Sequence, residues 1–152
     1  MRIENRLQLQ LWREECKEKH QKEKCRILVC GGTGCLAGGS DKIYARFKEM
    51  SEGMDHVTVK IGEEIAHPGV KMSGCHGFCE MGPLVRIEPY NYLYLKVKLE
   101  DCEEIFEKTI LRGEPVERLM YHDDHKVYET QEEIPFYAEQ TRLVLKNCGH
   151  ID

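Results

Sequence analysis

The sequence has no long apolar run, because charged residues make up 32% of its 152 residues and interrupt every stretch. A membrane-spanning helix needs about 20 consecutive apolar residues, so we expect no direct insertion into a membrane. The first 20 residues carry charges throughout and lack both the apolar core and the small-residue cleavage site of a secretory signal. These absences predict a soluble protein of the cytoplasm.

Motifs of catalysis and of nucleic-acid binding are also missing. The sequence contains no H-E-x-x-H, no G-x-S-x-G and no G-K-[ST] motif, so it predicts no catalytic site within this chain. Its 27 acidic residues outnumber its 22 basic residues, for a formal net charge of −5. A mildly acidic chain without a basic stripe predicts no nucleic-acid partner.

Cysteine, in contrast, is abundant, with eight residues. Secreted mini-proteins use such numbers as disulfide staples, but a chain of roughly 150 residues buries enough surface to fold without them. In a reducing compartment, clustered cysteines more often bind metal or carry out redox chemistry.

Hydrophobic periodicity predicts an α/β fold with a mixed sheet. Ile3, Leu7 and Leu11 recur at four-residue spacing in an expected helix over residues 3–20, which packs either on its own domain or on a partner chain. Strand–helix–strand, a further strand, a hairpin and a closing helix follow, which fits a compact sheet flanked by helices. The expected strands are residues 25–30, 56–61, 70–75, 85–89 and 92–97, and the expected later helices are residues 41–50 and 100–113.

Several residues mark the expected ends and faces of these elements. Ser40 is a candidate N-cap for the helix over residues 41–50, and Tyr90 and Asn91 form the expected hairpin turn. Gly113 is the expected stop of the last helix, whose inward residues are predicted to be Ile105, Ile110 and Leu111. We expect three parts: an N-terminal helix (1–23), a domain (24–113) and an extension (114–152).

Two cysteine pairs stand out because each follows an expected strand. Cys30 and Cys35 lie in CGGTGC, and Cys75 and Cys79 lie in CHGFCEMGP. If the two strands are neighbours, their loops bring all four thiols to one end of the sheet. Four thiolates can hold a [2Fe–2S] cluster, two on each iron, and the glycines around them allow backbone N–H groups to approach the sulfurs.

The same spacing leaves other interpretations open. A structural zinc site takes four thiolates at similar spacing, which would make the chain an interaction module without redox activity. Disulfides would need an oxidising compartment, and a thioredoxin-type site would need C-x-x-C, which Cys75 and Cys79 do not form. Gly32, Gly34 and Ala37 also match G-x-G-x-x-A of dinucleotide-binding proteins, but Glu52, the acidic candidate, precedes the next strand.

The remaining cysteines and the histidines are expected to be structural or solvated. Cys25 begins the strand that Cys30 ends, so the two lie about 16 Å apart at about 3.3 Å per residue and cannot share a site. We interpret Cys16, Cys102 and Cys148 as small buried or free thiols. His76 is expected to be a solvated loop residue, and His122 and His125 to belong to a solvated charge run.

Taken together, ILVCGGTGC, VKMSGCHGFCEMGPLVRIEP and YLYLKV resemble the thioredoxin-like [2Fe–2S] ferredoxins. This resemblance implies a thioredoxin-like fold and a [2Fe–2S] cluster ligated by Cys30, Cys35, Cys75 and Cys79. It favours iron–sulfur over zinc, and it implies an electron carrier.

The residues after the last helix resemble a narrower group. ILRGEPVERLM and IPFYAEQTRLVLKNCGHID are similar to the join between such a domain and the FMN- and NADH-binding domain of complex I-type flavoprotein (beta) subunits. Those subunits belong to NAD(P)-linked hydrogenases and formate dehydrogenases. The implied partners are an FMN/NADH-binding domain or subunit and other iron–sulfur subunits of an NAD(P)H-dependent oxidoreductase. The chain would be part of a longer subunit or a stand-alone version.

Overall fold

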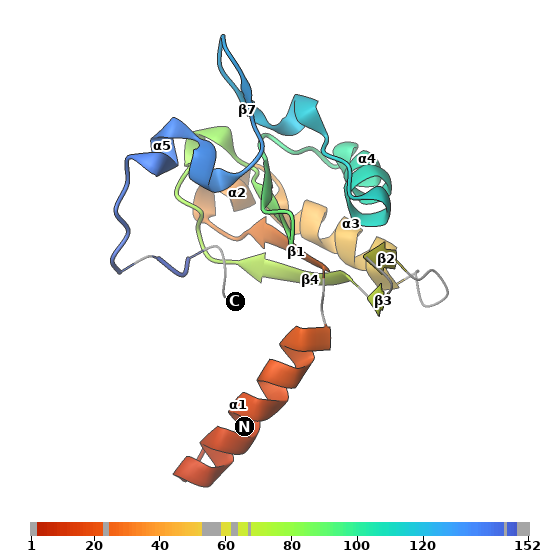
Figure 1. The fold of residues 1–152 in the computed structure, drawn as a ribbon. Helices are drawn as coiled ribbons and strands as arrows, with labels where there is room; N and C mark the ends of the chain where they lie inside the picture. Colours follow the sequence, from red (N-terminus) through yellow and green to blue (C-terminus); the bar gives the residue numbers. More distant parts are fainter. Residues whose placement is uncertain are drawn as a thin grey trace.

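The computed structural model describes residues 3–22, 25–52, 59–61, 64–66, 68–144 and 146–148. Its main sheet has the strand order β4–β1–β5–β6 (Figure 1). β1 pairs with β4 in parallel and with β5 antiparallel, and β5 pairs antiparallel with β6. The predicted mixed sheet is therefore confirmed. The strands are β1 (Cys25–Cys30), β4 (Pro68–Ser73), β5 (Val85–Glu88) and β6 (Tyr92–Tyr94).

The parallel pair fixes where the two cysteine loops begin. Its register runs from Cys25 opposite Pro68 to Cys30 opposite Ser73, so both strands end at the same edge of the sheet. Strands paired in parallel share their carboxyl edge. The loops that carry the cysteine pairs therefore start side by side.

Helices cover the sheet and close the core. Helix α3 (Ser40–Glu52) packs on β1, on β4 and on α4 (Asp101–Ile105). The chain continues from α4 into the π-helical turn η2 (Phe106–Ile110). The main core joins apolar side chains of β1, α3, β5 and these last helices, all of which are fully buried: Ile27, Val29, Phe47, Ile87, Ile105 and Ile110.

Several expected boundaries differ from the structure. Pro68 and Gly69 begin β4 instead of preceding it, and the strand expected over 92–97 stops at Tyr94, before Lys96 adopts a φ of 49°. The second expected strand begins in residues that lie outside the described ranges. Its described part, β2 (Val59–Ile61), pairs locally with β3 (Glu64–Ala66) and not with the main sheet.

Helix ends also differ in detail. Ser40 is the first residue of α3, and its buried Oγ has no hydrogen-bond partner within the described part of the chain, so it is not a side-chain N-cap. Gly113, with a φ of 75°, ends the last helix as expected. Ile105 and Ile110 are buried, but Leu111 is 39% exposed because the π-helical turn shifts its position around the helix.

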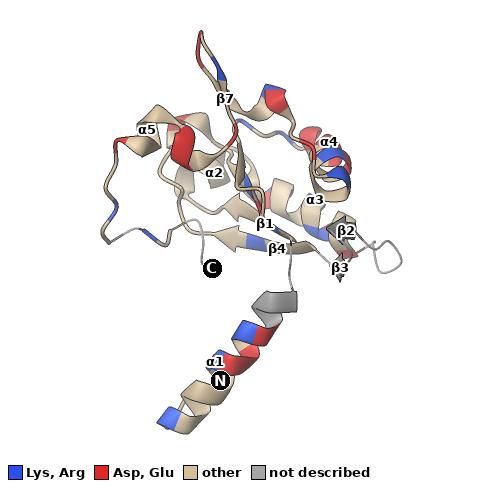
Figure 2. Cartoon of the chain, viewed as in Figure 1, with Lys and Arg blue, Asp and Glu red and all other residues tan. Residues whose placement is uncertain are grey.

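The N-terminal helix α1 (Arg6–Lys22) begins later than expected, so Ile3 precedes it. It extends away from the sheet in Figure 1, and Figure 2 shows acidic and basic residues interleaved along it. Its apolar residues Leu7, Leu11 and Trp12 are 66%, 58% and 46% exposed. Packing on a partner chain thus stays a prediction. No described helix is both long and apolar enough to cross a membrane.

The extension forms more structure than its polar sequence indicates. It contains η3 (Glu117–Leu119), the hairpin of β7 (Tyr121–His122) and β8 (Val127–Tyr128), η4 (Gln131–Glu133) and α5 (Pro135–Ala138). The amide of Leu93 donates a hydrogen bond to the carbonyl of Glu129, and the amide of Leu95 donates one to the carbonyl of Leu119. The extension therefore lies along the free edge of β6.

One buried hydroxyl ties the sheet to the start of the extension. The Tyr94 hydroxyl lies 2.5 Å from Thr109 Oγ1 and accepts a hydrogen bond from the amide of Val116. Thr109 in turn donates to the carbonyl of Glu114. Tyr94 is fully buried. Water therefore cannot replace its hydroxyl as the hydrogen-bond partner of Thr109 and of the Val116 amide.

We expect Tyr94→Phe to lower the free energy of unfolding by about 1–3 kcal/mol, because it leaves a buried N–H without its acceptor. Urea titration of the full chain measures this change. The partly exposed Tyr92 is the matched control, and Tyr92→Phe should change stability by less than about 0.5 kcal/mol. Equal effects of the two substitutions would contradict this role of Tyr94.

Candidate metal centre

The four candidate cysteines come from two strand ends and the segments that follow them. Cys30 is the last residue of β1, and Cys35 lies in the short helix α2 (Thr33–Ala37) where a loop was expected. Cys75 follows β4 in a loop, and Cys79 begins the 3-10 turn η1 (Cys79–Met81). Thus the parallel strands deliver both pairs to one edge, as predicted.

The thiols of the two loops lie close together. The sulfurs of Cys75 and Cys79 are 3.8 Å apart. A Cβ atom at Gly32 would lie 3.0 Å from the Cys75 sulfur and 3.5 Å from the Cys30 sulfur, so this one glycine touches both loops. A side chain at position 32 would push the pairs apart.

Glycine is also required beside Cys35, but not beside Cys79. A Cβ at Gly82 would lie 2.7 Å from the sulfur of Cys35, closer than real Cβ contacts allow. At Gly34, in contrast, a Cβ would meet Cys79 Cβ at 3.4 Å, which is ordinary contact. Gly82 therefore makes room for the Cys35 sulfur, whereas a Cβ at position 34 would fit beside Cys79.

Backbone amides point at the sulfurs. The amide of Gly77 donates to Cys75 Sγ at 3.3 Å. The amides of Gly32 and His76 act to lower the pKa of the Cys30 thiol, and the amide of Leu84 acts to lower that of Cys35. Such donors stabilise thiolates and bound cluster sulfurs, and they tune the reduction potential of a cluster.

The thiols of Cys30 and Cys35 lie close enough to shift each other's ionisation. The Cys35 thiol lowers the pKa of Cys30 to about 6, and the Cys30 thiol raises the pKa of Cys35 well above its ordinary value. Burial opposes ionisation of both thiols. One proton thus leaves this pair readily and the second does not, and a bound cation would offset the repulsion between the two thiolates.

Burial divides the site into two sides. Cys30 and Cys35 are fully buried, with Leu84, Leu93 and Leu95 around them in a second apolar core. Cys75 and Cys79 are exposed. One pair is therefore held rigidly by the core, and the other faces solvent.

His76 is not the solvated loop residue that the sequence predicted. It is fully buried, and its Nε2 lies 2.8 Å from Ser73 Oγ. Ser73 ends β4 and its hydroxyl also bonds the carbonyl of Val29 in β1. The imidazole therefore anchors the second cysteine loop to the parallel strand pair, which the isolated sequence C-H-G-F-C does not indicate.

Residues of the extension complete the site. Ile134 and Tyr137 pack into the same apolar core as Cys30 and Cys35. The Tyr137 hydroxyl is buried and has no hydrogen-bond partner among the described residues. Burial raises its pKa, and negative charge on Cys30 and Cys75 raises it further, so the phenol lies within electrostatic reach of the thiols. A buried O–H without an acceptor fits a site that receives a group rich in acceptor sulfurs.

The other cysteines lie elsewhere or differ in character. Cys25 is buried at the opposite end of β1, and Cys102 is buried in α4; burial raises the pKa of each thiol to about 12. Cys16 is exposed on α1. Cys148 is half-buried and lines a surface hollow together with Cys75.

Two further candidates do not form sites. β1 has β5 as an antiparallel neighbour, unlike the first strand of a doubly wound parallel sheet, so the G-x-G-x-x-A match lacks the dinucleotide-binding context. His122 and His125 are exposed, as expected. Over the described ranges, no three His, Cys, Asp or Glu side chains lie close enough together to hold a single metal ion, whereas a [2Fe–2S] cluster needs only two thiolates on each iron.

Two pairs of thiols at one sheet edge, with amides directed at the sulfurs, define the class of thiolate-ligated metalloproteins. The spacing of the cysteines did not decide between zinc and iron. Comparison with known proteins favours iron over zinc. The sequence profile of the thioredoxin-like [2Fe–2S] ferredoxins matches residues 17–109, and the chain belongs to this family.

Individual relatives agree with this family. A [2Fe–2S] ferredoxin of Aquifex aeolicus is 50% identical over 86 residues, which are 57% of this chain and 71% of the relative. One from Clostridium pasteurianum is 32% identical over 98 residues, 63% of this chain and 94% of the relative. A solved thioredoxin-like [2Fe–2S] ferredoxin from Aquifex aeolicus superimposes with a TM-score of 0.52 at 31% identity, covering 64% of this chain and 89% of the other.

The cofactor of the chain is accordingly a [2Fe–2S] cluster, and its role is electron transfer. The residues present fit this group: two cysteine loops that meet at Gly32, an amide that donates to the Cys75 sulfur, and the buried Tyr137 hydroxyl, which has no acceptor among the described residues. The predicted fold, family and cofactor are thus confirmed.

We expect Gly82→Ala to weaken cluster binding about tenfold, because its Cβ would displace the sulfur of Cys35. Iron retained per chain during chelator challenge measures the loss. Gly34→Ala is the matched control, since its Cβ fits and alanine favours helix α2. Parent-like iron retention in Gly82→Ala would contradict the close packing against Cys35.

Proposed function

We propose that Cys30, Cys35, Cys75 and Cys79 hold the [2Fe–2S] cluster and that this chain is a one-electron carrier. The observation that carries the assignment is that the two cysteine loops meet at Gly32, where a Cβ would lie 3.5 Å from the Cys30 sulfur and 3.0 Å from the Cys75 sulfur. When bound, the cluster supplies one-electron redox chemistry. The protein holds it at a fixed place and sets its potential.

The two sides of the site have different roles in this proposal. Cys30 and Cys35 anchor the site in the apolar core, which excludes water from that side. Cys75 and Cys79 face solvent, where a partner can approach within electron-transfer distance. The amide of Gly77 donates a hydrogen bond to Cys75 Sγ, and the amides of Gly32 and His76 favour the thiolate of Cys30.

We further propose that the partner is a flavin- or iron–sulfur-containing domain or subunit of an NAD(P)H-linked oxidoreductase complex of the cytoplasm. Support comes from the segments 110–120 and 134–152, which are similar to the join with an FMN- and NADH-binding domain. All eight cysteines are free thiols, as suits a reducing compartment.

The ligand assignment predicts loss of the cluster in Cys30→Ser and in Cys75→Ser. Serine is a harder and much weaker ligand for these irons than thiolate. Anaerobic visible spectra with and without dithionite, combined with iron and zinc analysis, measure the loss. The parent chain should be brown, hold about two irons and bleach on reduction.

Cys25→Ser and Cys102→Ser are matched controls, since each removes a buried thiol outside the site. Both should keep parent-like spectra. Full cluster incorporation in Cys30→Ser or Cys75→Ser would overturn the ligand assignment. A colourless parent that holds one zinc after anaerobic reconstitution with iron and sulfide would overturn the carrier function.

The partner assignment predicts that a complex I-type FMN subunit, reduced by NADH, bleaches the oxidised cluster of this chain. Stopped-flow absorbance follows the reaction, and NADH without the flavoprotein is the control. If dithionite bleaches the cluster but the reduced flavoprotein does not, the proposed partner class is wrong.

A further inference from the structure

The segment after α5 returns to the second cysteine loop. Arg142 Nη2 donates a hydrogen bond of 2.9 Å to the carbonyl oxygen of His76, the residue that follows Cys75. Gly77 adopts a φ of 86°, and a Cβ there would lie 2.7 Å from the same nitrogen. The guanidinium thus fills a space that only glycine leaves open, directly beside the loop whose amide donates to the Cys75 sulfur.

The aromatic ring of Tyr137 holds the guanidinium from its other side. Arg142 Cζ lies 5.0 Å from the ring centroid of Tyr137, within cation–π range. Tyr137 is 7% exposed and packs beside Cys30 and Cys35. Burial raises the pKa of the Tyr137 phenol, the positive charge of Arg142 lowers it, and negative charge on the thiols raises it. The phenol therefore interacts electrostatically with both Arg142 and the thiols. The ring therefore lies between the cation and the buried thiol pair.

The described hydrogen-bond partners of Arg142 are all neutral groups. Its other described hydrogen bonds go to the neutral amide of Gln140, at 3.2 and 3.3 Å. Within the described part of the chain, no carboxylate forms an ion pair with it. Arginine also stays protonated at any working pH. A full positive charge is thus fixed beside the exposed side of the candidate centre.

We propose that Arg142 is a positioning residue that raises the reduction potential of the cluster by fixing a positive charge on the Cys75 loop. The inference rests on the proposed function. Reduction adds one negative charge to the cluster, and a fixed cation stabilises the more negative, reduced form. Partial burial against Tyr137 reduces the screening of that charge by solvent. The extension is then part of the redox site and not only a connection to a further domain.

The test is a spectroelectrochemical titration of the anaerobically reconstituted full chain and its variants. Arg142→Gln should lower the equilibrium constant for reduction by about tenfold, which is a shift of about 59 mV to lower potential for a one-electron couple. Arg142→Lys keeps the charge and should stay within about twofold of the parent.

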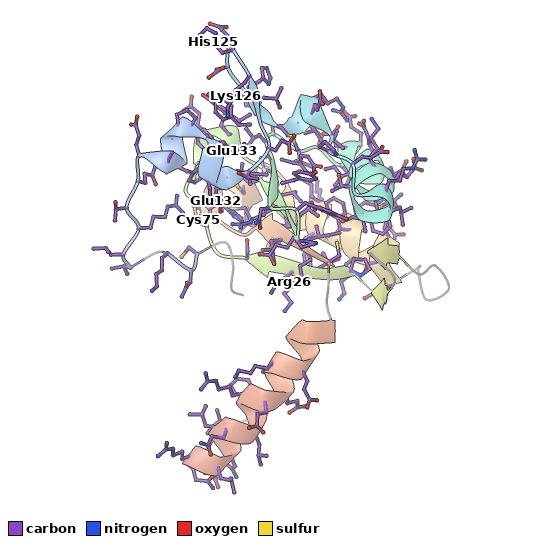
Figure 3. All side chains as sticks on the ribbon, viewed as in Figure 1. Arg26, Cys75, His125, Lys126, Glu132 and Glu133 are labelled. Carbon is purple, nitrogen blue, oxygen red and sulfur yellow. The ribbon has the colours of Figure 1, made fainter. Side chains whose placement is uncertain are left out.

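A matched control lies in the same extension. Lys126 Nζ lies 4.4 Å from the ring centroid of Tyr128, so it makes the same kind of contact. It lies on the β7–β8 hairpin, away from Cys75 (Figure 3). Lys126→Gln removes the same charge from the chain and should leave the potential unchanged.

The outcomes separate this inference from the function on which it rests. A parent without a cluster overturns the proposed function, and this inference with it. A parent with a cluster whose potential is unchanged in Arg142→Gln overturns the inference alone. If Arg142→Gln fails to assemble, the neutral variant Arg142→Met decides: a tenfold lower equilibrium constant for reduction supports the charge effect, and a parent-like potential contradicts it.

Discussion

The parallel pairing of β1 with β4 is the constraint on which the site depends. Both strands end at the same sheet edge, and each is followed at once by a cysteine-bearing segment. A slip of one residue would turn the side chain of Cys30 to the other face of the sheet and break the pairing of the thiols. The register is held by the buried residues of β1 and by Ser73, which bonds both the carbonyl of Val29 and the imidazole of His76.

Gathering four thiols at this edge creates an electrostatic problem that the surrounding backbone partly solves. Thiolates repel one another, and burial of Cys30 and Cys35 makes their ionisation costlier still. Amide donors from Gly32, Gly77 and Leu84 stabilise negative charge without adding titratable groups. Glycine makes these approaches possible, and Gly82 shows how little space remains around the Cys35 sulfur.

Much of this arrangement could be predicted from the sequence because it follows from local patterns. The strand that ends at Cys30, the hairpin turn at Asn91 and the helix stop at Gly113 each have a local signal, and the structure confirms them. The choice between zinc and iron had no such signal. Both metals accept four thiolates at this spacing, and only similarity to known proteins separated them.

What the sequence did not indicate depends on contacts between distant residues. His76 is a loop histidine by its neighbours, yet it is buried because Ser73 offers an acceptor and Arg142 covers its carbonyl. A regular helical period predicts that Leu111 points into the core. The π-helical turn before it breaks that period. The extension had weak periodicity because its structure depends on the edge of β6, and its own pattern carries little information.

Residues of the extension also form part of the candidate site. The family match ends at residue 109, whereas Ile134 and Tyr137 lie against the buried thiols and Arg142 lies against the exposed loop. The extension therefore places apolar side chains on the buried side, together with a hydroxyl that has no partner among the described residues, and it places a cation on the exposed side. Cover on the buried side limits water and lowers the local dielectric, which strengthens every nearby charge. A site described by its four candidate ligands alone would omit these residues of the extension.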